Sequence, residues 1–378
     1  MQSIKTWGGI DVSAETLAVC RWRDGLDEHR TFSNDGAGHR EIVKFLGKRS
    51  RVCIEATGVY HLQVALALHA AGVEIMVVNP RVAKDYARAL SNRSKTDQVD
   101  AHVLLDFARR MEFHAWEPPS AAALELRELG RRLTELVHAR IGETNRLHAR
   151  TTSSISKGVI ADVRQHVRQL ETRIKQIERA AIAVLRTDAD LREQYELLVA
   201  GTGIGKRSAI LLLGELAVLD PTMTVRELVA HVGLDPRVYE SGTSVEKPTR
   251  ISKVGNARVR ATLYMVALPA IRYDRGARTF FARLVARGKK PMQAIVAVMR
   301  KMLHGVWTVM QRRVPFDNSL LFAASLAQAE SSDSAVAAPK PEQEQSHPQD
   351  RSEAEELRQQ LDSVPAEATR RRKKRKAA

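Results

Sequence analysis

Short apolar runs alternate with helical patterns along the N-terminal third of the chain. Strand-like runs occupy residues 4–12, 17–20, 29–32, 51–54 and 74–78. Apolar residues recur at helical spacing over 36–46, 60–71 and 82–90, and again after Asp97. Turn and cap residues separate these segments, for example Asp24-Gly25, Gly72 and Asn79-Pro80. The order of three strands followed by helix, strand, helix, strand and helix predicts an α/β domain with a mixed sheet.

Carboxylates end two of the predicted strands. Asp11 lies at the end of the first strand, and Glu55 follows the fourth. Three hairpin strands followed by a crossover are typical of the ribonuclease H-like fold, in which the first and fourth strands lie side by side. This topology predicts that Asp11 and Glu55 are neighbours, with the helix that starts at Asp97 packed across them. The alternative is that Asp11 caps a turn and Glu55 caps the Thr57-Gly58 loop.

Asp97 and Asp100 lie three residues apart, so a helix places both carboxylates on one face. Two neighbouring carboxylates repel each other, and they stay ionised at neutral pH only when a cation lies between them. A hard divalent ion with oxygen ligands fits such a pair. The alternative is that the first turn of a helix favours aspartate because of the helix dipole.

Residues 120–200 carry two long amphipathic patterns and are nearly free of glycine and proline. The apolar stripe is interrupted between Thr151 and Gly158 and then resumes. Two such helices joined by a turn predict a coiled-coil hairpin. Hairpins of this kind most often serve as arms or self-association devices, so we expect a homo-oligomer that is held together by this segment.

Two glycine-containing segments follow the hairpin. Residues 201–206 resemble a helix-hairpin-helix, whose backbone N–H groups would suit a phosphate. A plain tight turn is the alternative, and the spacing of a nucleotide-binding P-loop is absent. Residues 233–244 have the composition of a loop and contain Ser241.

Closely spaced cations follow Ser241, namely Lys247, Arg250, Lys253, Arg258 and Arg260. A hydroxyl among several cations suits attack on a phosphodiester, because the cations stabilise the developing anion. The same side chains are candidates for contacts with nucleic-acid phosphates. The alternative is a solvated serine in a surface loop.

The 378-residue chain carries a formal net charge of +16, which favours a polyanionic partner such as nucleic acid. The excess is concentrated in one region. Residues 201–328 hold 20 basic and 8 acidic residues, whereas 1–114 hold 16 and 14, and 115–200 hold 14 and 12. Residues 329–378 are rich in Ala, Ser, Gln, Glu and Pro, and we expect them to be disordered.

Cysteine usage and hydropathy bear on the compartment. The two cysteines, Cys20 and Cys53, have no metal-ligand spacing around them, which fits a reduced cytoplasm. No apolar run reaches the roughly 18 residues that a membrane span needs, and the N-terminus lacks a signal-peptide pattern. We expect a cytoplasmic protein.

A set of short motifs, taken together, resembles DEDD transposases of the insertion sequence 110 family, which are akin to the Piv/MooV invertases. The motifs are Gly9-Ile10-Asp11, Ile54-Glu55-Ala56-Thr57-Gly58, Asn79-Pro80, Lys95-Thr96-Asp97 with Asp100-Ala101, Gly203-Ile204-Gly205, Gly233-Leu234, Tyr239-Glu240-Ser241-Gly242, and Ser252-Lys253 with Gly255. They occur in order between about residues 7 and 317. Thr202 stands where the family usually has proline.

The resemblance implies a RuvC-like domain in which Asp11, Glu55, Asp97 and Asp100 hold Mg²⁺. It implies that Ser241, in a C-terminal transposase domain, is the nucleophile and forms a covalent phosphoserine link to DNA. It also implies that a noncoding bridge RNA takes part in recognising donor and target DNA. The expected organisation is a RuvC-like domain at 1–114, a helical coiled-coil hairpin at 115–200, a mainly α-helical transposase domain at 201–328 and a disordered tail at 329–378.

Two other functions stay open at this point. A metal-dependent DNA junction nuclease would use water as its nucleophile, with Ser241 as a bystander. A nucleic-acid-binding module would use the four acids only structurally. An actin-like sugar kinase also begins with a Gly-Ile-Asp strand, but the chain has no second glycine-rich phosphate loop in an Asp-x-Gly setting.

Overall fold

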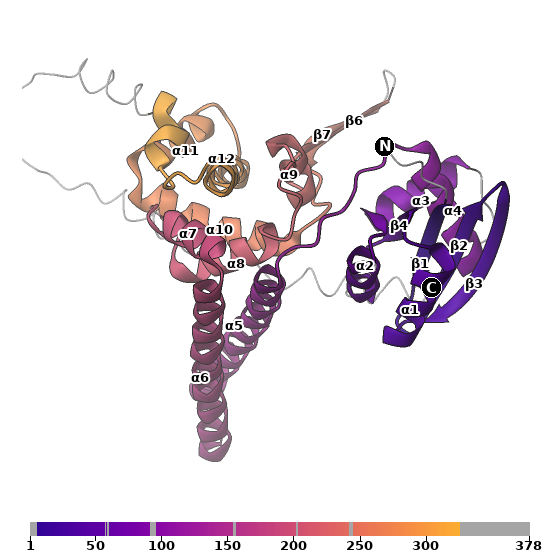
Figure 1. Cartoon of the computed structure of the whole chain (residues 1–378). Helices are drawn as coiled ribbons and strands as arrows, with labels where there is room; N and C mark the ends of the chain where they lie inside the picture. The colour runs from indigo at the N-terminus through magenta and orange to yellow at the C-terminus, as the bar shows by residue number, and fades with distance from the viewer. Residues whose placement is uncertain are drawn as a thin grey trace, which may run out of the picture. The chain divides into compact units, whose positions relative to one another are not determined.

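A computed structural model describes residues 6–325, with gaps at 57, 59, 91–95, 154–155, 202 and 242–244, and it leaves out the side chains of 238–249. The tail expected at 329–378 therefore lies outside the described residues. The N-terminal part contains a five-stranded sheet with the order β3-β2-β1-β4-β5 (Figure 1). The strands are β1 (Thr6–Val12), β2 (Thr16–Arg23), β3 (Leu26–Ser33), β4 (Ser50–Glu55) and β5 (Glu74–Val78).

The strand pairing is that of a ribonuclease H-like fold, as the sequence predicted. β1, β2 and β3 form an antiparallel meander, because each is joined to the next by a short turn. β4 pairs parallel with β1, and β5 pairs parallel with β4. Parallel neighbours need crossover connections, which here are helices.

Helices cover both faces of this sheet. α1 (Gly36–Leu46) and α2 (Tyr60–Ala70) pack on one face, and α3 (Pro80–Ala89) and α4 (Asp97–Arg110) pack on the other. The first face buries Ile10 of β1 and Ile54 of β4 completely. Because side chains alternate along a strand, Gly9 and Cys53 point to the α4 face, where Cys53 packs against Leu104.

The predicted helical hairpin is confirmed. α5 (Ala121–Ser153) and α6 (Lys157–Thr187) run antiparallel along each other (Figure 1). Their seam buries Leu133 and Leu136 of α5 against Leu170 and Ile174 of α6. Ser156 caps α6 by accepting a hydrogen bond from the Val159 N–H, which favours the start of the helix at Lys157.

The C-terminal part is mainly helical and shares one core with the base of the hairpin, including Leu126 and Leu185. Its helices are α7 (Ala189–Val199), α8 (Lys206–Leu216), α9 (Val225–Val232), α10 (Ala257–Tyr273), α11 (Arg275–Ala286) and α12 (Pro291–Arg312). Among the described residues, no helix is long and apolar enough to cross a membrane.

The loop predicted at 233–244 is in part a strand, so that expectation was wrong. β6 (Pro236–Ser241) pairs antiparallel with β7 (Val245–Ile251) as a two-stranded ribbon. Composition suggested a loop because Pro, Gly and small hydroxyls dominate the segment. Backbone pairing with β7 makes the strand, and the composition of one segment does not reveal its partner.

Candidate active site

Asp11 and Glu55 lie at the same edge of the sheet. Ile10 of β1 is in register with Ile54 of the parallel strand β4, and the two acids follow directly in each strand. They lie two residues after Gly9 and Cys53, so alternation directs both carboxylates to the face that α4 covers. The predicted neighbourhood of these two acids is therefore produced by strand register.

The first turn of α4 carries Asp97 and Asp100. Thr96 caps this helix by accepting a hydrogen bond from the Val99 N–H at 3.3 Å. The helix lies unusually close to β1, because a Cβ built on Gly9 would lie 2.1 Å from the Ala101 carbonyl oxygen. Only glycine permits this approach, which brings the first turn of α4 to the end of β1.

The pKa of Asp11 is affected by the other three acids. Burial, as the largest cause, and the charges of Asp100, Asp97 and Glu55, in that order of effect, together raise the pKa of Asp11 to about 6. Three carboxylates can act on one Asp11 only if they lie near it. The structure thus brings together the four acids that the sequence singled out.

The donor set fits a divalent cation. Four carboxylates supply hard oxygen ligands and a negative charge that a divalent ion would offset. As they stand, no three His, Cys, Asp or Glu side chains of the described residues are grouped closely enough to hold a metal ion. A divalent cation held by these acids would offset the repulsion among their charges.

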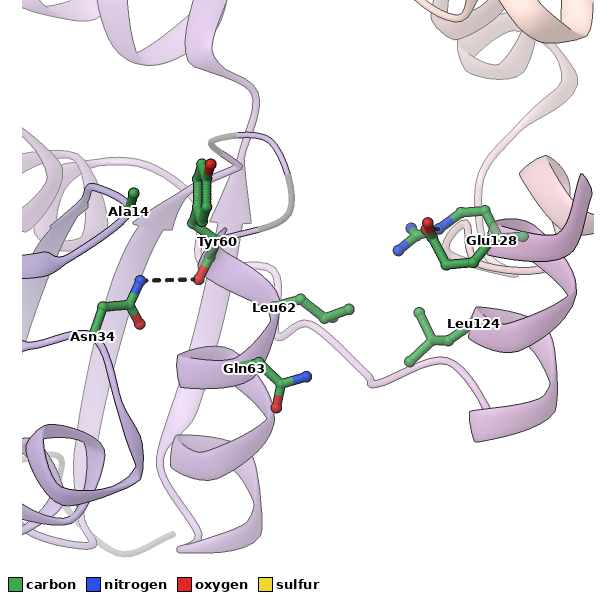
Figure 2. Close-up of a pocket in the computed structure, with 8 residues that line it drawn as sticks. Ala14, Asn34, Tyr60, Leu62, Gln63, Leu124 and Glu128 are labelled. Carbon is green, nitrogen blue, oxygen red and sulfur yellow. Dashed lines mark hydrogen bonds and ion pairs between the residues drawn. The ribbon is translucent and has the colours of Figure 1, made fainter. Parts of the chain in front are cut away.

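Asn34 is a positioning residue that the sequence analysis missed. Its Nδ2 donates to the Ser13 carbonyl at 2.9 Å and to the Tyr60 carbonyl at 3.4 Å, as Figure 2 shows for Tyr60. Its Oδ1 lies 2.9 Å from Nε2 of His39. Ser13 lies two residues after Asp11, and Tyr60 lies five residues after Glu55. One side chain therefore links the segments that follow the two acids. An asparagine after a strand has no sequence signal for this role.

Ser241 belongs to a different part of the chain from the four acids. It is the last residue of β6, opposite Val245 of β7. Its side chain and that of Lys247 lie outside the described part. Arg250, Lys253 and Arg258 are exposed, as a phosphate contact requires.

Arg260 has a structural contact that the sequence did not suggest. Its side chain is half-buried and donates to the Val232 carbonyl at 2.7 Å. Burial lowers the pKa of this guanidinium. Arg260 therefore ties α10 to the end of α9, beside the ribbon.

The base of the ribbon is held by close backbone contacts. A Cβ on Gly255 would lie 1.9 Å from the His231 carbonyl oxygen, and the φ of Gly255 is 107°. The Lys253 N–H donates to the Gly233 carbonyl at 3.1 Å, and Ser252 Oγ donates to the Asp235 carboxylate. The two Gly-containing motifs at 233 and 255 thus fix where the ribbon leaves the helical core.

A buried carboxylate supports the same region. Glu215 of α8 accepts from Arg131 Nε of α5 and from Asn256 Nδ2, both at 2.8 Å. Burial alone would raise the pKa of Glu215, but these hydrogen bonds and nearby arginines hold it below its usual value. Asn256 in turn caps α10 by accepting from the Arg258 and Val259 N–H groups. The cluster therefore links the hairpin to the start of α10.

The glycines of the 201–206 segment have packing roles. A Cβ on Gly201 would lie 2.1 Å from the Phe316 ring, and Gly203 has a φ of 93° close to Ala270. These contacts favour the tight-turn interpretation of the two glycines. The N-terminus of α8 at Lys206 has no side-chain cap, so a phosphate contact there stays a prediction.

Comparisons with known proteins agree with this arrangement. A DEDD transposase family model matches residues 8–155, and a model described as "Transposase IS116/IS110/IS902 family" matches residues 195–282. The chain is 26% identical to pilin gene-inverting proteins of Moraxella bovis and Moraxella lacunata, over 84% of this chain and 99% of theirs. It is 23% identical to an uncharacterized 43.6 kDa protein of the insertion element IS110 from Streptomyces coelicolor, over 41% of this chain and 38% of that one. The two models together match more than half of the chain, which belongs to the IS110 family of DEDD transposases.

Proposed function

We propose that this transposase cuts and rejoins DNA strands through a covalent intermediate on Ser241, with Mg²⁺ held by Asp11, Glu55, Asp97 and Asp100. The observation that carries the proposal is that the other three acids act on Asp11, whose pKa rises to about 6. Structural acids are normally paired with cations or hydrogen-bond donors, which lower a carboxyl pKa. A raised pKa in a cluster of carboxylates is more typical of a catalytic metal site.

The acids and the serine have different roles in the proposed reaction. Mg²⁺, when bound, supplies a Lewis acid that stabilises negative charge on a phosphate undergoing substitution. Ser241 Oγ forms a new ester bond to phosphorus while one P–O ester bond of the strand breaks. The serine proton passes to a base, and the released sugar oxygen takes up a proton. The number of phosphoester bonds is unchanged, so the reverse reaction rejoins a strand without ATP.

The exposed cations near the ribbon support the nucleophile assignment. Arg250, Lys253 and Arg258 follow Ser241 closely in sequence and are solvent-accessible. Cations of this kind stabilise the charge that develops on a phosphodiester under attack. Lys247, opposite Tyr239 in the ribbon, belongs to the same set. The pilin gene-inverting relatives are named for a DNA inversion, which also requires cutting and rejoining.

Ser241→Ala is expected to remove the covalent intermediate and to lower recombination by more than about 1000-fold, because no other group replaces the attacking oxygen. A denaturing gel of protein with labelled DNA should show a slow protein–DNA band for the wild type and none for Ser241→Ala. Ser244→Ala is the matched control, since Ser244 lies three residues after Ser241 in the sequence, and should keep the band. Normal DNA cleavage by Ser241→Ala without a covalent band would favour the water-using junction nuclease instead.

We further propose that a noncoding RNA, rather than the protein, selects the DNA sequence. Residues 201–328 hold 20 basic against 8 acidic residues, a surface suited to holding nucleic-acid backbones. Aromatic residues are only 5% of the chain, too few for extensive base readout by stacking. Zinc-finger and basic-zipper patterns are absent from the sequence. A backbone-holding protein fits a system in which base pairing reads the sequence.

Purified protein with donor and target DNA alone is expected to give no recombinant. RNA transcribed from the noncoding flanks of the element should restore product, because it supplies the missing base pairing. Changing the loop of that RNA should redirect the target site. Sequence-specific recombination by the RNA-free protein would show that the protein itself reads the DNA.

The hairpin is the proposed self-association element. Ile141 of α5 is 45% exposed and Val159 of α6 is 40% exposed, both beyond the buried seam of the hairpin. A second copy would cover these apolar side chains by the same heptad packing.

A further inference from the structure

The elbow between α10 and α11 exposes a tyrosine among arginines. Tyr273, the last residue of α10, is 66% exposed, well above the 47% of Tyr60. Arg272, Arg275 and Arg278 around it are also exposed. Residues 272–290 contain seven Lys or Arg and a single acid, Asp274. This run therefore carries a marked excess of positive charge.

Asp274, the single acid of this run, forms hydrogen bonds with the backbone. Asp274 caps α11 by accepting from the Ala277 N–H at 2.7 Å, and its own N–H donates to the Ala270 carbonyl at 2.8 Å. Its carboxylate is therefore engaged in holding the elbow. The run stays positive because its seven basic residues outnumber this one acid.

The elbow is also held in one geometry. Arg278 folds back and donates to the carbonyls of Ile271 and Arg272 at the end of α10. These are among the carbonyls that a helix C-terminus leaves without intrahelical partners. The Arg272 guanidinium lies 5.3 Å from the Tyr273 ring centroid, in cation–π range. The ring is thus positioned by the backbone while most of its surface faces solvent.

Two other aromatic rings of the C-terminal part are enclosed by protein, in contrast to Tyr273. Phe280 of α11 lies 5.7 Å from Phe322, between the helices, and both rings lie under the Lys301 amine. Tyr273 has no such enclosure, so its ring adds little to the core. An exposed ring with cations on either side combines the two features of single-strand recognition, a stacking surface for a base and charges for the phosphates.

We infer that Tyr273 stacks on an unpaired base of a nucleic acid, while Arg272, Arg275 and Arg278 hold the flanking phosphates. The inference rests on the proposed nucleic-acid function and adds a contact site to it. The ligand is an unpaired nucleotide, either in a displaced DNA strand or in a loop of RNA. A protein partner fits less well, because Tyr273 belongs to a stretch with six exposed cations, Arg272, Arg275, Arg278, Arg287, Lys289 and Lys290.

Tyr273→Ala in the full-length protein is expected to weaken binding of a short single strand about 5- to 100-fold, the range for loss of one stacked base. Tyr273→Trp and Tyr273→Phe should retain binding, because both keep a stacking surface. Blunt duplex of the same sequence should bind as it does to the wild type. The salt dependence of binding should not change, because no charge is removed.

The assay uses fluorescence anisotropy with the same sequence as single-stranded DNA, single-stranded RNA and duplex. A fluorescent adenine analogue in the strand adds a direct readout, since stacking on Tyr273 quenches it. Met265→Ala is the matched control: Met265 is 62% exposed on the same helix and lies two turns away. It should leave both readouts unchanged. The larger loss, on DNA or on RNA, identifies the source of the base.

Three results would overturn the inference. One is Tyr273→Ala binding all three probes like the wild type. Another is equal loss on single strand and duplex, which would assign the tyrosine to duplex binding. The third is that Tyr273→Ala changes the oligomeric state, measured by light scattering, while nucleic-acid binding stays intact. That result would make the elbow a protein interface. A wild-type protein that binds no nucleic acid at all would instead remove the proposed function.

Discussion

Asp11→Asn is expected to abolish DNA strand exchange and, at the same time, to stabilise the metal-free protein at pH 7. Loss of one hard oxygen ligand weakens a divalent site severely, and the rest of the reaction depends on that site. The ionised carboxylate is also the group that three others repel. Asparagine keeps the size and removes the charge. Asp97→Asn and Asp100→Asn should likewise lose activity without loss of folding.

The pH dependence of stability follows from the raised pKa. Asp11 holds its proton more tightly in the folded state, with a pKa of about 6, than in the unfolded state, with a pKa of 3.8. At pH values below about 4, Asp11 is protonated in both states and does not reduce the free energy of unfolding. As the pH rises through 6, the folded protein must ionise Asp11, and the free energy of unfolding falls. Allowing for solvent screening of a half-exposed group, the destabilisation at pH 7 is roughly 1–2 kcal/mol.

Urea unfolding at pH 4 and pH 7, in the presence of a chelator, measures this difference. Asp11→Asn should be more stable than the wild type at pH 7 and similar at pH 4. Asp24→Asn is the control, because Asp24 is exposed in the β2–β3 turn, where its φ of 51° also suits asparagine. It should retain strand exchange and wild-type stability. Full strand exchange by Asp11→Asn would contradict the assignment of the site.

Gly9→Ala is expected to destabilise the fold by more than about 3 kcal/mol and to remove activity, because α4 must move away from β1. The new Cβ would lie 2.1 Å from the Ala101 carbonyl oxygen and 2.2 Å from the Leu105 nitrogen. Both atoms belong to helix backbone, so no side-chain rotation relieves the clash. Asp97 and Asp100 would move with the helix, away from Asp11.

Gly8→Ala is the matched control in the same strand. Its Cβ would meet Leu46 Cδ2 at 3.0 Å and Val52 Cγ2 at 3.3 Å, both at the ends of side chains. Small rotations relieve such contacts, so stability and strand exchange should stay near those of the wild type. Urea denaturation together with titration of a divalent metal separates the two variants. Equal behaviour of Gly8→Ala and Gly9→Ala would mean that the approach of α4 does not organise the acids.

Periodicity and turn residues are sufficient to predict most elements. The order of strands and helices in the N-terminal part and the helical hairpin follow from apolar spacing, because those helices and strands bury one face each. The ribbon at 236–251 was missed because its stability comes from pairing with a partner strand. Local composition at 233–244 pointed to a loop.

The four acids were recognisable from their positions at strand ends and at the start of a helix, together with the family motifs. The supporting residues were not. Asn34 joins the loops after Asp11 and Glu55, and Glu215 joins Arg131 to Asn256. Each link spans 20 or more residues of sequence and depends on how elements pack, which single-residue patterns do not encode.

The sequence by itself determined which residues are acidic, where strands and helices run and which family the chain resembles, because these depend on local pattern. Only the tertiary structure decided that α4 lies against Gly9, that Asp11 is repelled by three carboxylates, and that Tyr273 is exposed beside arginines. Each of these depends on distances between elements far apart in the chain. Such distances are set by packing, in which one methyl group at Gly9 is enough to separate a helix from its strand.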